Sequence, residues 1–322
     1  MHELRWNPVM RTWVMLASGR EKRPLMPKDY CPFCPGSKQV PEDYDVFAYQ
    51  NDWPILSTEP PVITGIPDSF FRNTPAYGRC EVLLYTSDHH SSLAGLSPEN
   101  MEKLVDLWVD RHTVFAADEK VKYVFIFENR GPEIGATIVH PHGQIYGFPF
   151  IPKKIEIELE GCRAFYDEEG KNLYREMLAG ELRDGSRIVD ENDSFVTFVP
   201  YFAEYPYQVY IMPREHRLSM DDLQADERRD LGRSVANIVA IYDAVFNRPF
   251  PYMMCFHQQP VDGNAYPYYQ FHIEFYPPLR NEKTKKFDAS SETGAMVHGN
   301  PSSPEMKAAE MRTIKEKLHG KK

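Results

Sequence analysis

The sequence predicts an α+β fold in which two similar halves place helices against a mostly antiparallel sheet. Three observations lead to this prediction. Short runs rich in aromatic and β-branched residues, typical of strands, are separated by turn residues. Longer amphipathic patterns, typical of helices, follow some of these strands. The order of strand, helix and strand occurs twice, which favours an internal duplication over a chance likeness of two α+β segments.

In the first half, Ser97 and Pro98 form a helix cap followed by a first-turn proline. We therefore expect a helix from this point to about residue 118, with Leu104 and Trp108 on its apolar side. The expected strands of this half are RTWVML, YDVFAY, RCEVLLYTS, KYVFIFEN and ATIVHPHGQIYGF, the last covering residues 136–148.

In the second half, a long helical pattern covers roughly residues 219–246. TSDHHSSLAGLSPENMEKL aligns with PREHRLSMDDLQADERRDL, so that an acidic–histidine pair falls on an acidic–histidine pair. The expected strands are SFVTFVPY, YQVYIMP, PYMMCFHQ and YYQFHIEFYP. An acidic helical stretch near 155–186 links the halves, which we place at residues 1–180 and 181–322.

Composition narrows the class of protein. The 322 residues are 42% hydrophobic and 26% charged, which is ordinary for a globular protein. The net charge of −10 argues against general nucleic-acid binding but does not exclude a phosphate ligand, which needs only a few local cations. The basic stretch GREKRP is either such a cluster or a solvated loop. The sequence has no apolar run of about 18 residues, so no membrane span is predicted. Its beginning lacks signal-peptide features, and we therefore expect a cytoplasmic location.

The stretch VHPHGQIYGF concentrates polar groups in an apolar run. Alternate side chains share a face of a strand, so His140, His142 and Gln144 are expected side by side. Pro141 lacks a backbone donor and indicates a strand edge or an irregular segment. Gly143 permits close backbone approach or an unusual dihedral angle. Two imidazoles and an amide on one face favour a functional site; the alternative is a pair of satisfied structural histidines.

HPHGQI resembles the active-site signature of the galactose-1-phosphate uridylyltransferases, a branch of the histidine-triad superfamily. The resemblance covers nearly the whole chain, because other motifs appear in the family's order: NPVMRTWVML, GREKRP, CPFC, QNDWP, FENRG, FHIEFYPPL and KKF. It implies two fused histidine-triad-like halves. It also implies a transferase of galactose metabolism (the Leloir pathway) that moves UMP from UDP-glucose to galactose 1-phosphate. The first half would carry zinc and the nucleophile, and the second a tail that completes the site.

His142 suits the role of nucleophile, because an imidazole nitrogen can attack phosphorus and is then a good leaving group. The resembling family forms a uridylyl-histidine in a ping-pong reaction. The other ring nitrogen needs an acceptor that fixes the tautomer, and the resemblance implies a nearby backbone carbonyl. The amide of Gln144 can donate to a phosphate oxygen without titrating. By resemblance, a glutamine at this place favours transfer, since related hydrolases have a histidine there.

The resemblance also implies substrate contacts and a homodimer with shared active sites. The UDP-sugar and sugar 1-phosphate would meet residues near the phosphates, the uridine and the phosphate-side loop, and two residues that reach the neighbouring subunit's site. These are, in that order, Arg20 and Arg23; Asn51, Asp52 and Trp53; Asn129, Gly135 and Thr137; and Lys286 and Phe287. Ser291 is a departure, since an aromatic residue is common in the family at its place.

Cys31 and Cys34 have zinc-knuckle spacing, which by itself is ambiguous between zinc and redox chemistry. The resemblance supplies two further ligands, His89 and His140, with His90 as the alternative to His89. Four protein ligands leave no open position, so this zinc is expected to be structural.

The resemblance further implies a second metal ion, held in the family by a glutamate and three histidines. The matching residues are Glu158, His257, His272 and Glu274, and the last is a departure from histidine. Carboxylates with imidazoles suit zinc or iron. We expect Glu274 at the place that His142 has in the first half, and no chemistry in the second half. A buried charge network without metal is the alternative.

Two other functions share much of this pattern. Nucleotide-sugar and dinucleoside-polyphosphate phosphorylases also have the order histidine, histidine, glutamine, but differ in the base and the acceptor. A non-catalytic nucleotide-binding protein could keep the zinc-stabilised scaffold. The presence of His142, Gln144 and the arginines argues against the second of these.

Overall fold

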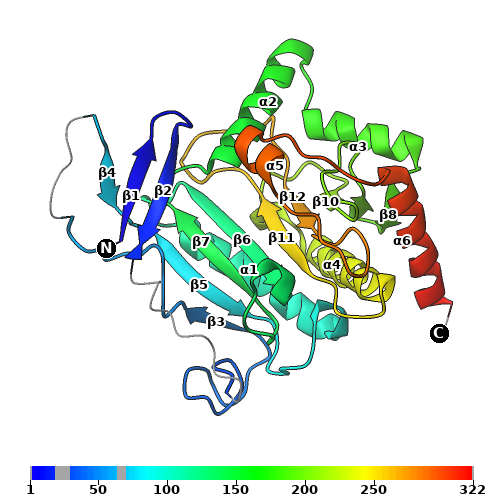
Figure 1. The fold of residues 1–322 in the computed structure, drawn as a ribbon, viewed down its shortest axis with the longest axis horizontal. Helices are drawn as coiled ribbons and strands as arrows, with labels where there is room; N and C mark the ends of the chain where they lie inside the picture. The colour runs from blue at the N-terminus through cyan, green and yellow to red at the C-terminus, as the bar shows by residue number, and fades with distance from the viewer. Residues whose placement is uncertain (1, 19–29, 64–69, 321–322) are drawn as a thin grey trace.

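The computed structural model of the protein describes residues 2–18, 30–63 and 70–320. Two antiparallel sheets and the helices around them form the fold (Figure 1). The small sheet has the order β2-β1-β4, and the large one has the order β3-β5-β7-β6-β11-β12-β10-β9-β8. The strands are β1 (His2–Asn7), β2 (Thr12–Ala17), β3 (Phe47–Gln50), β4 (Asn73–Pro75), β5 (Arg79–Leu84), β6 (Tyr123–Arg130), β7 (His142–Phe148), β8 (Ile188–Glu191), β9 (Phe195–Phe198), β10 (Val209–Pro213), β11 (Tyr252–His257) and β12 (His272–Tyr276).

The large sheet shows the expected duplication. Reading outward from its centre, β6, β7, β5 and β3 lie on one side, and β11, β12, β10 and β9 lie on the other in the matching order. β6 pairs with β11 in antiparallel fashion, with Phe127 opposite Cys255 and Arg130 opposite Tyr252. An approximate two-fold axis between these strands therefore relates the halves, which share one continuous sheet. The predicted α+β class with duplicated halves is confirmed.

Helices cover both faces of this sheet. α1 (Pro98–Ala116) and α4 (Ala225–Val245) pack against each other and bury Trp108, Val235 and Ile238 with residues of one face. The other helices are α2 (Lys153–Glu169), α3 (Leu173–Asp184), α5 (Ser290–Ala295) and α6 (Pro304–His319). The predicted linker thus forms α2 and α3, which pack on the opposite face through side chains such as Leu159 and Leu178.

Local sequence explains where the two long helices begin. The Ser97 hydroxyl accepts a hydrogen bond from the backbone N–H of Asn100, as expected of an N-cap. α4 begins at Ala225, because Gln224 and Glu227 form a capping box there. The helix expected over 219–246 is therefore too long at its start, where Met220–Asp222 forms a separate 3-10 turn.

The strand expected over 136–148 is also too long. β7 begins at His142, and residues 136–141 are irregular. Pro141 has no N–H to donate to a strand ladder, and Gly135 adopts a positive φ of 82° in the turn before it. Strand alternation therefore aligns His142 with Gln144 but does not include His140, whose side chain is fully buried.

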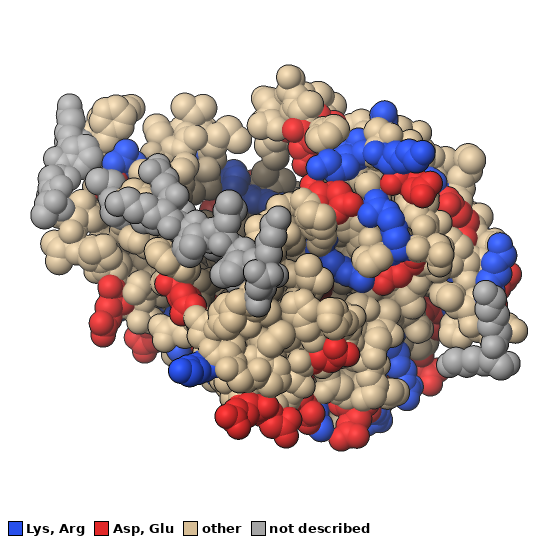
Figure 2. Space-filling model, turned by 60° about the horizontal axis from the view of Figure 1, so that its bottom comes forward, with Lys and Arg blue, Asp and Glu red and all other residues tan. Residues whose placement is uncertain are grey.

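Surface charge agrees with the acidic composition. On the face shown in Figure 2, acidic residues line the lower rim and basic residues stand interspersed with acidic ones elsewhere. This face presents no broad basic surface for a nucleic-acid backbone. Among the helices in the part of the chain that the structure describes, none is both long and apolar enough to span a bilayer.

Candidate active site and metal clusters

His142 opens β7 with a fixed ring orientation. Its Nδ1 lies 2.7 Å from the carbonyl oxygen of His140. A carbonyl only accepts, so Nδ1 carries the proton and the lone pair lies on Nε2. The Phe33 ring packs 5.3 Å from the imidazole, measured between ring centroids. This orientation suits a nucleophile that uses Nε2.

Gln144 lies two residues further along β7 and shares the face of His142, since the residues between and beyond them are buried. The Tyr146 hydroxyl donates to Gln144 Oε1 at 3.2 Å. Because the amide oxygen is engaged in this bond, the NH₂ group is the part of the side chain that can donate to an anion. The amide is therefore oriented as a donor near the nucleophile.

Gly143, between these two residues, is required by close packing and not by its dihedral angles. A Cβ atom at this position would lie 2.1 Å from the Tyr85 hydroxyl oxygen and 3.0 Å from the Phe127 carbonyl oxygen. Tyr85 is fully buried and cannot swing away. Of the two expectations for Gly143, close backbone approach is the one that the structure supports.

The four predicted zinc ligands come together. Ligand atoms of Cys31, Cys34, His89 and His140 all lie within 4.8 Å of one another. Cys34 Sγ is 3.4 Å from His89 Nδ1 and 3.7 Å from His140 Nδ1. His90 lies outside this group. His140 Nε2 donates to the Thr86 carbonyl oxygen at 2.7 Å, which leaves the Nδ1 lone pair facing the cysteines. Two thiols and two imidazoles in this arrangement fit a tetrahedral metal ion.

A cavity of about 520 Å³ lies beside the nucleophile. His142, Asn129 and His140 line it together with His90, the alternative zinc ligand, and Glu128, which sequence reasoning missed. Burial raises the pKa of the Glu128 carboxyl to about 7, while Arg130 and the Tyr252 hydroxyl oppose this rise. Its place in the FENRG motif is the signal that could have found Glu128 in the sequence.

The other predicted substrate residues occupy several loops. Asn51 follows β3, and its side-chain oxygen accepts from the backbone N–H of Trp53 at 2.9 Å, so these two and Asp52 share one tight turn. Gly135 ends the 3-10 turn Pro132–Ile134, and Thr137 is exposed two residues later. Arg20 and Arg23 lie outside the described residues.

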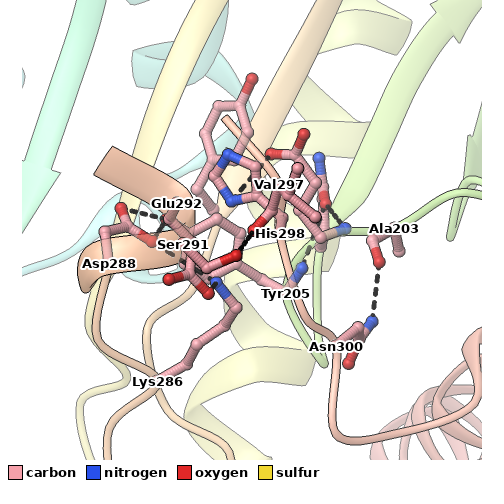
Figure 3. A network of polar contacts seen from close by, with 12 residues as sticks. Ala203, Tyr205, Lys286, Asp288, Ser291, Glu292, Val297, His298 and Asn300 are labelled. Atoms are coloured by element: carbon pink, nitrogen blue, oxygen red, sulfur yellow. Dashed lines mark hydrogen bonds and ion pairs between the residues drawn. The ribbon is translucent and has the colours of Figure 1, made fainter. Parts of the chain in front are cut away.

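Lys286 and Phe287 differ in their surroundings, although they are neighbours in the chain. Lys286 is buried, with its Nζ 3.4 Å from Asp288 Oδ1, 3.5 Å from Glu292 Oε1 and 4.5 Å from the centre of the Tyr205 ring. Phe287 is 66% exposed. Figure 3 shows this network, in which Ser291 donates to the Val297 carbonyl oxygen and closes the segment around α5. The tail therefore has a defined shape within a single chain.

Three of the four residues predicted for the second metal site come together, and the fourth, Glu274, has other partners. Ligand atoms of Glu158, His257 and His272 lie within 4.8 Å of one another, close enough to hold a metal ion. Glu274 instead forms an ion pair with Lys154 at 2.9 Å, and its carboxylate oxygens lie 3.2 Å from His272 Nε2 and 3.5 Å from His257 Nε2. Sequence reasoning missed Lys154, because a lysine at the start of a helix, here next to Lys153, carries no signal of a buried partner.

The match between the halves is shifted relative to our expectation. His272 opens β12 as His142 opens β7, and its Nδ1 lies 3.0 Å from the Gln270 carbonyl oxygen, two residues before it. His142 makes the same bond to the residue two before it. His272, and not Glu274, therefore holds the place of His142, while Glu274 matches Gln144. The expectation failed because matching HPH (140–142) with HIE (272–274) is too short a sequence comparison to decide which residues of the two strands correspond.

Known proteins resemble this chain along almost its whole length. Residues 2–152 match the family model of the galactose-1-phosphate uridyl transferase N-terminal domain, and residues 158–319 match that of the C-terminal domain. The galactose-1-phosphate uridylyltransferase of Thermotoga maritima is 40% identical, covering 97% of this chain and 98% of its own. That of Haemophilus influenzae is 28% identical over 88% and 86% of the two chains.

Solved structures agree in fold. A uridylyltransferase structure with 28% identity superposes with a TM-score of 0.90, covering 98% of this chain and 99% of its own. An ADP-glucose phosphorylase from Arabidopsis thaliana, with ADP-glucose bound, has a TM-score of 0.74 at 24% identity, over 97% and 98% of the two chains. The second likeness concerns the fold alone.

Proposed function

Because this chain belongs to the galactose-1-phosphate uridyl transferase family, we propose that it transfers a uridylyl group from UDP-glucose to galactose 1-phosphate through His142. The observation that carries this proposal is the bond from His142 Nδ1 to the His140 carbonyl, since it leaves the Nε2 lone pair as the nucleophile. The division of the chain into functional halves at residue 180 is part of the same proposal.

The reaction follows from this geometry in two displacements. His142 Nε2 attacks the α-phosphorus of UDP-glucose, a P–N bond forms, and the bond from this phosphorus to the bridging oxygen breaks. Glucose 1-phosphate leaves with that electron pair. A phosphate oxygen of galactose 1-phosphate then attacks the same phosphorus, the P–N bond breaks, and UDP-galactose leaves. Gln144 donates its amide N–H to a non-bridging oxygen, which stabilises the charge that builds up in both steps.

We further assign zinc to the group of Cys31, Cys34, His89 and His140. When bound there, zinc supplies no open position for chemistry and acts as a cross-link. His140 then has two functions: its Nδ1 binds the metal ion, and its carbonyl oxygen holds the nucleophile. A metal ion held there would thereby fix the backbone from which His142 is oriented.

For the substrates, we propose the contacts that the family resemblance implies. The turn of Asn51, Asp52 and Trp53 holds the uridine, and Asn129 with the loop of Gly135 and Thr137 meets the phosphates. Arg20 and Arg23 belong to the same proposal. The exposed Phe287 and the segment of Lys286 reach the site of a second copy in a homodimer. The exposure of Phe287 supports this assignment.

An isotope experiment tests the nucleophile. UDP-glucose labelled in the α-phosphate should transfer label to the protein, whereas label in the β-phosphate should leave with glucose 1-phosphate. His142→Asn should abolish both protein labelling and exchange between UDP-glucose and glucose 1-phosphate, because asparagine cannot attack phosphorus. A folded variant with near-normal exchange would show that another residue is the nucleophile.

A substrate panel tests the reaction. UDP-glucose with galactose 1-phosphate should react faster than ADP-glucose, and a sugar 1-phosphate should be a better acceptor than inorganic phosphate. A preference for ADP-glucose and inorganic phosphate would identify a phosphorylase instead. If no nucleotide ever labels the protein and no product forms, the chain is a non-catalytic nucleotide-binding protein.

A further inference from the structure

The second metal group differs from the first in containing a cation of the chain itself. Lys154, in the first turn of α2, places its Nζ 2.9 Å from Glu274 Oε2 and 4.0 Å from Glu158 Oε1. The same ammonium contacts the Tyr276 hydroxyl and lies 4.7 Å from the centre of that ring. Lys154 reaches in from the surface, whereas Glu274 is only 1% exposed. A positive charge therefore covers the buried carboxylate.

The imidazoles of this group are already engaged. His257 has a carboxylate oxygen at each ring nitrogen, Glu158 at 2.9 Å from Nδ1 and Glu274 at 3.5 Å from Nε2. His272 has the Gln270 carbonyl at Nδ1 and Glu274 at Nε2. Glu158 also accepts from the Tyr269 hydroxyl at 2.7 Å. Each carboxylate thus has partners of its own, as a buried polar network requires.

Two opposite charges at this site compensate each other. Where the resembling family has a third histidine, this chain has Glu274, which adds a negative charge. Lys154 adds a positive charge directly beside it. A divalent ion placed among these residues would lie close to the ammonium and would be repelled by it.

We propose that Lys154 serves as the cation of this cluster in place of a second metal ion, so that Glu158, His257, His272 and Glu274 form a metal-independent ionic network. The second half then contributes structure through charge pairing, while the group that contains Cys31 and Cys34 remains the metal site.

Cobalt(II) binding to the full-length protein tests this proposal. Cobalt bound by thiolates gives an intense near-ultraviolet charge-transfer band, and cobalt bound only by nitrogen and oxygen does not. After removal of metal, titration with cobalt and desalting, every cobalt ion retained by the wild-type chain should contribute to the thiolate band. One additional equivalent without that band would overturn the proposal.

A designed variant provides the converse test. Lys154→Met together with Glu274→His removes the ammonium and restores the family's ligand set, and it should retain one more cobalt per chain than the wild type. Lys154→Met alone is the matched control and should melt at a lower temperature, because Glu274 loses its partner. A double variant that melts cooperatively but gains no cobalt would count against the proposal. If the double variant does not fold, anomalous diffraction from cobalt-soaked wild-type crystals decides: a peak between His257 and His272 would refute the proposal, and clean density there would support it.

Discussion

At the residue scale, the site shows how one residue type acquires two functions within three positions. His140 donates from Nε2 and keeps its lone pair on Nδ1, which faces the cysteines. His142 donates from Nδ1 and keeps its lone pair on Nε2. The opposite tautomers follow from the two backbone carbonyls that accept these protons, one from Thr86 and one from His140 itself. Backbone geometry thus suits the two histidines to the two roles proposed for them, metal ligand for His140 and nucleophile for His142.

Gly143→Ala should damage both stability and activity. The added Cβ would overlap the buried Tyr85 hydroxyl, so β7 must shift and carry His142 and Gln144 with it. We expect a loss of about 2–3 kcal/mol in the free energy of unfolding, the upper part of the range for overpacked cores, and a loss of about 100-fold in kcat, typical of an ångström-scale misplacement. Denaturant unfolding and the transfer assay measure these effects.

Two further variants establish the cause. Tyr85→Phe in the Gly143→Ala background removes the overlapping oxygen and should restore part of the stability. Gly161→Ala in α2 is the matched control, since a Cβ there meets nothing within 4 Å. It should stabilise the protein slightly, because alanine is the better helix former. Equal effects of Gly143→Ala and Gly161→Ala would exclude the packing explanation.

Glu128 predicts a pH-dependent stability. Its pKa is raised from 4.5 to about 7 by burial, so the folded state binds the proton more tightly than the unfolded state. Its contribution is fully present below pH 4.5 and is lost as the pH rises towards 7, by about 3 kcal/mol in total. Glu128→Gln cannot ionise, so its melting temperature should exceed that of the wild type increasingly between pH 5 and pH 8.

The exposed Glu102 provides the control for this series. Glu102→Gln should follow the wild type at every pH. A constant difference between Glu128→Gln and the wild type across the range would show that the carboxyl does not titrate with folding.

Sequence reasoning reached some of these residues and not others, for physical reasons. Strand alternation was enough to align His142 with Gln144, because both lie within one regular strand. It failed for His140, because Pro141 ends the ladder before that residue. Lys154 was beyond reach, since it is 120 positions from Glu274 and nothing local marks a lysine as a partner. Local rules predict local geometry, and contacts between distant segments depend on the packing of the whole chain.

At the element scale, the first metal group joins three segments that have little regular structure of their own. Cys31 and Cys34 come from a turn, His89 from the loop after β5, and His140 from the irregular approach to β7. In the described part of this region, Tyr44 adds a bond from its hydroxyl to the Phe33 carbonyl at 2.5 Å. Under the proposed zinc assignment, a metal ion at their meeting point would cross-link these segments in place of the strand ladder that they lack.

His89→Ala and His90→Ala form a matched pair that tests this cluster. His89 lies within the group and His90 lies next to it but outside. His89→Ala should lose most of its zinc and melt at a lower temperature, because metal binding and folding are coupled. His90→Ala should keep both its zinc and its melting temperature. Elemental analysis and calorimetry measure the two properties, and the reverse pattern would transfer the ligand role to His90.

At the scale of the whole molecule, the two halves are joined through their sheet and their helices. β6 and β11 share a hydrogen-bonded ladder at the centre. The Arg130 guanidinium of β6 forms a bidentate salt bridge with the Asp243 carboxylate of α4, with N–O distances of 2.8 and 2.9 Å. His112 of α1 contacts Asp221 of the second half at 2.8 Å. The halves are similar in fold but depend on each other for burial.

We therefore expect the protein to unfold in one cooperative transition. Calorimetry with excess zinc should show a single endotherm, with calorimetric and van't Hoff enthalpies in agreement. A fragment that ends at residue 186 should fail to give a cooperative melt, because β6 then lacks its neighbour β11. Two separate endotherms, or a stable isolated fragment, would mean that the halves are independent folding units.

α2 and α3 cover β12, and this bears on how the two duplicated halves could have diverged in evolution. His272 is fully buried, with the Tyr174 ring 4.6 Å from it, while its counterpart His142 remains partly accessible. If the halves began as equal copies, this covering would by itself have closed the second copy to substrate. Its polar residues were then free to change, as long as their charges stayed balanced. Exchanging a single side chain would then not open the second half to chemistry, since α2 and α3 would still cover His272 and keep a substrate out.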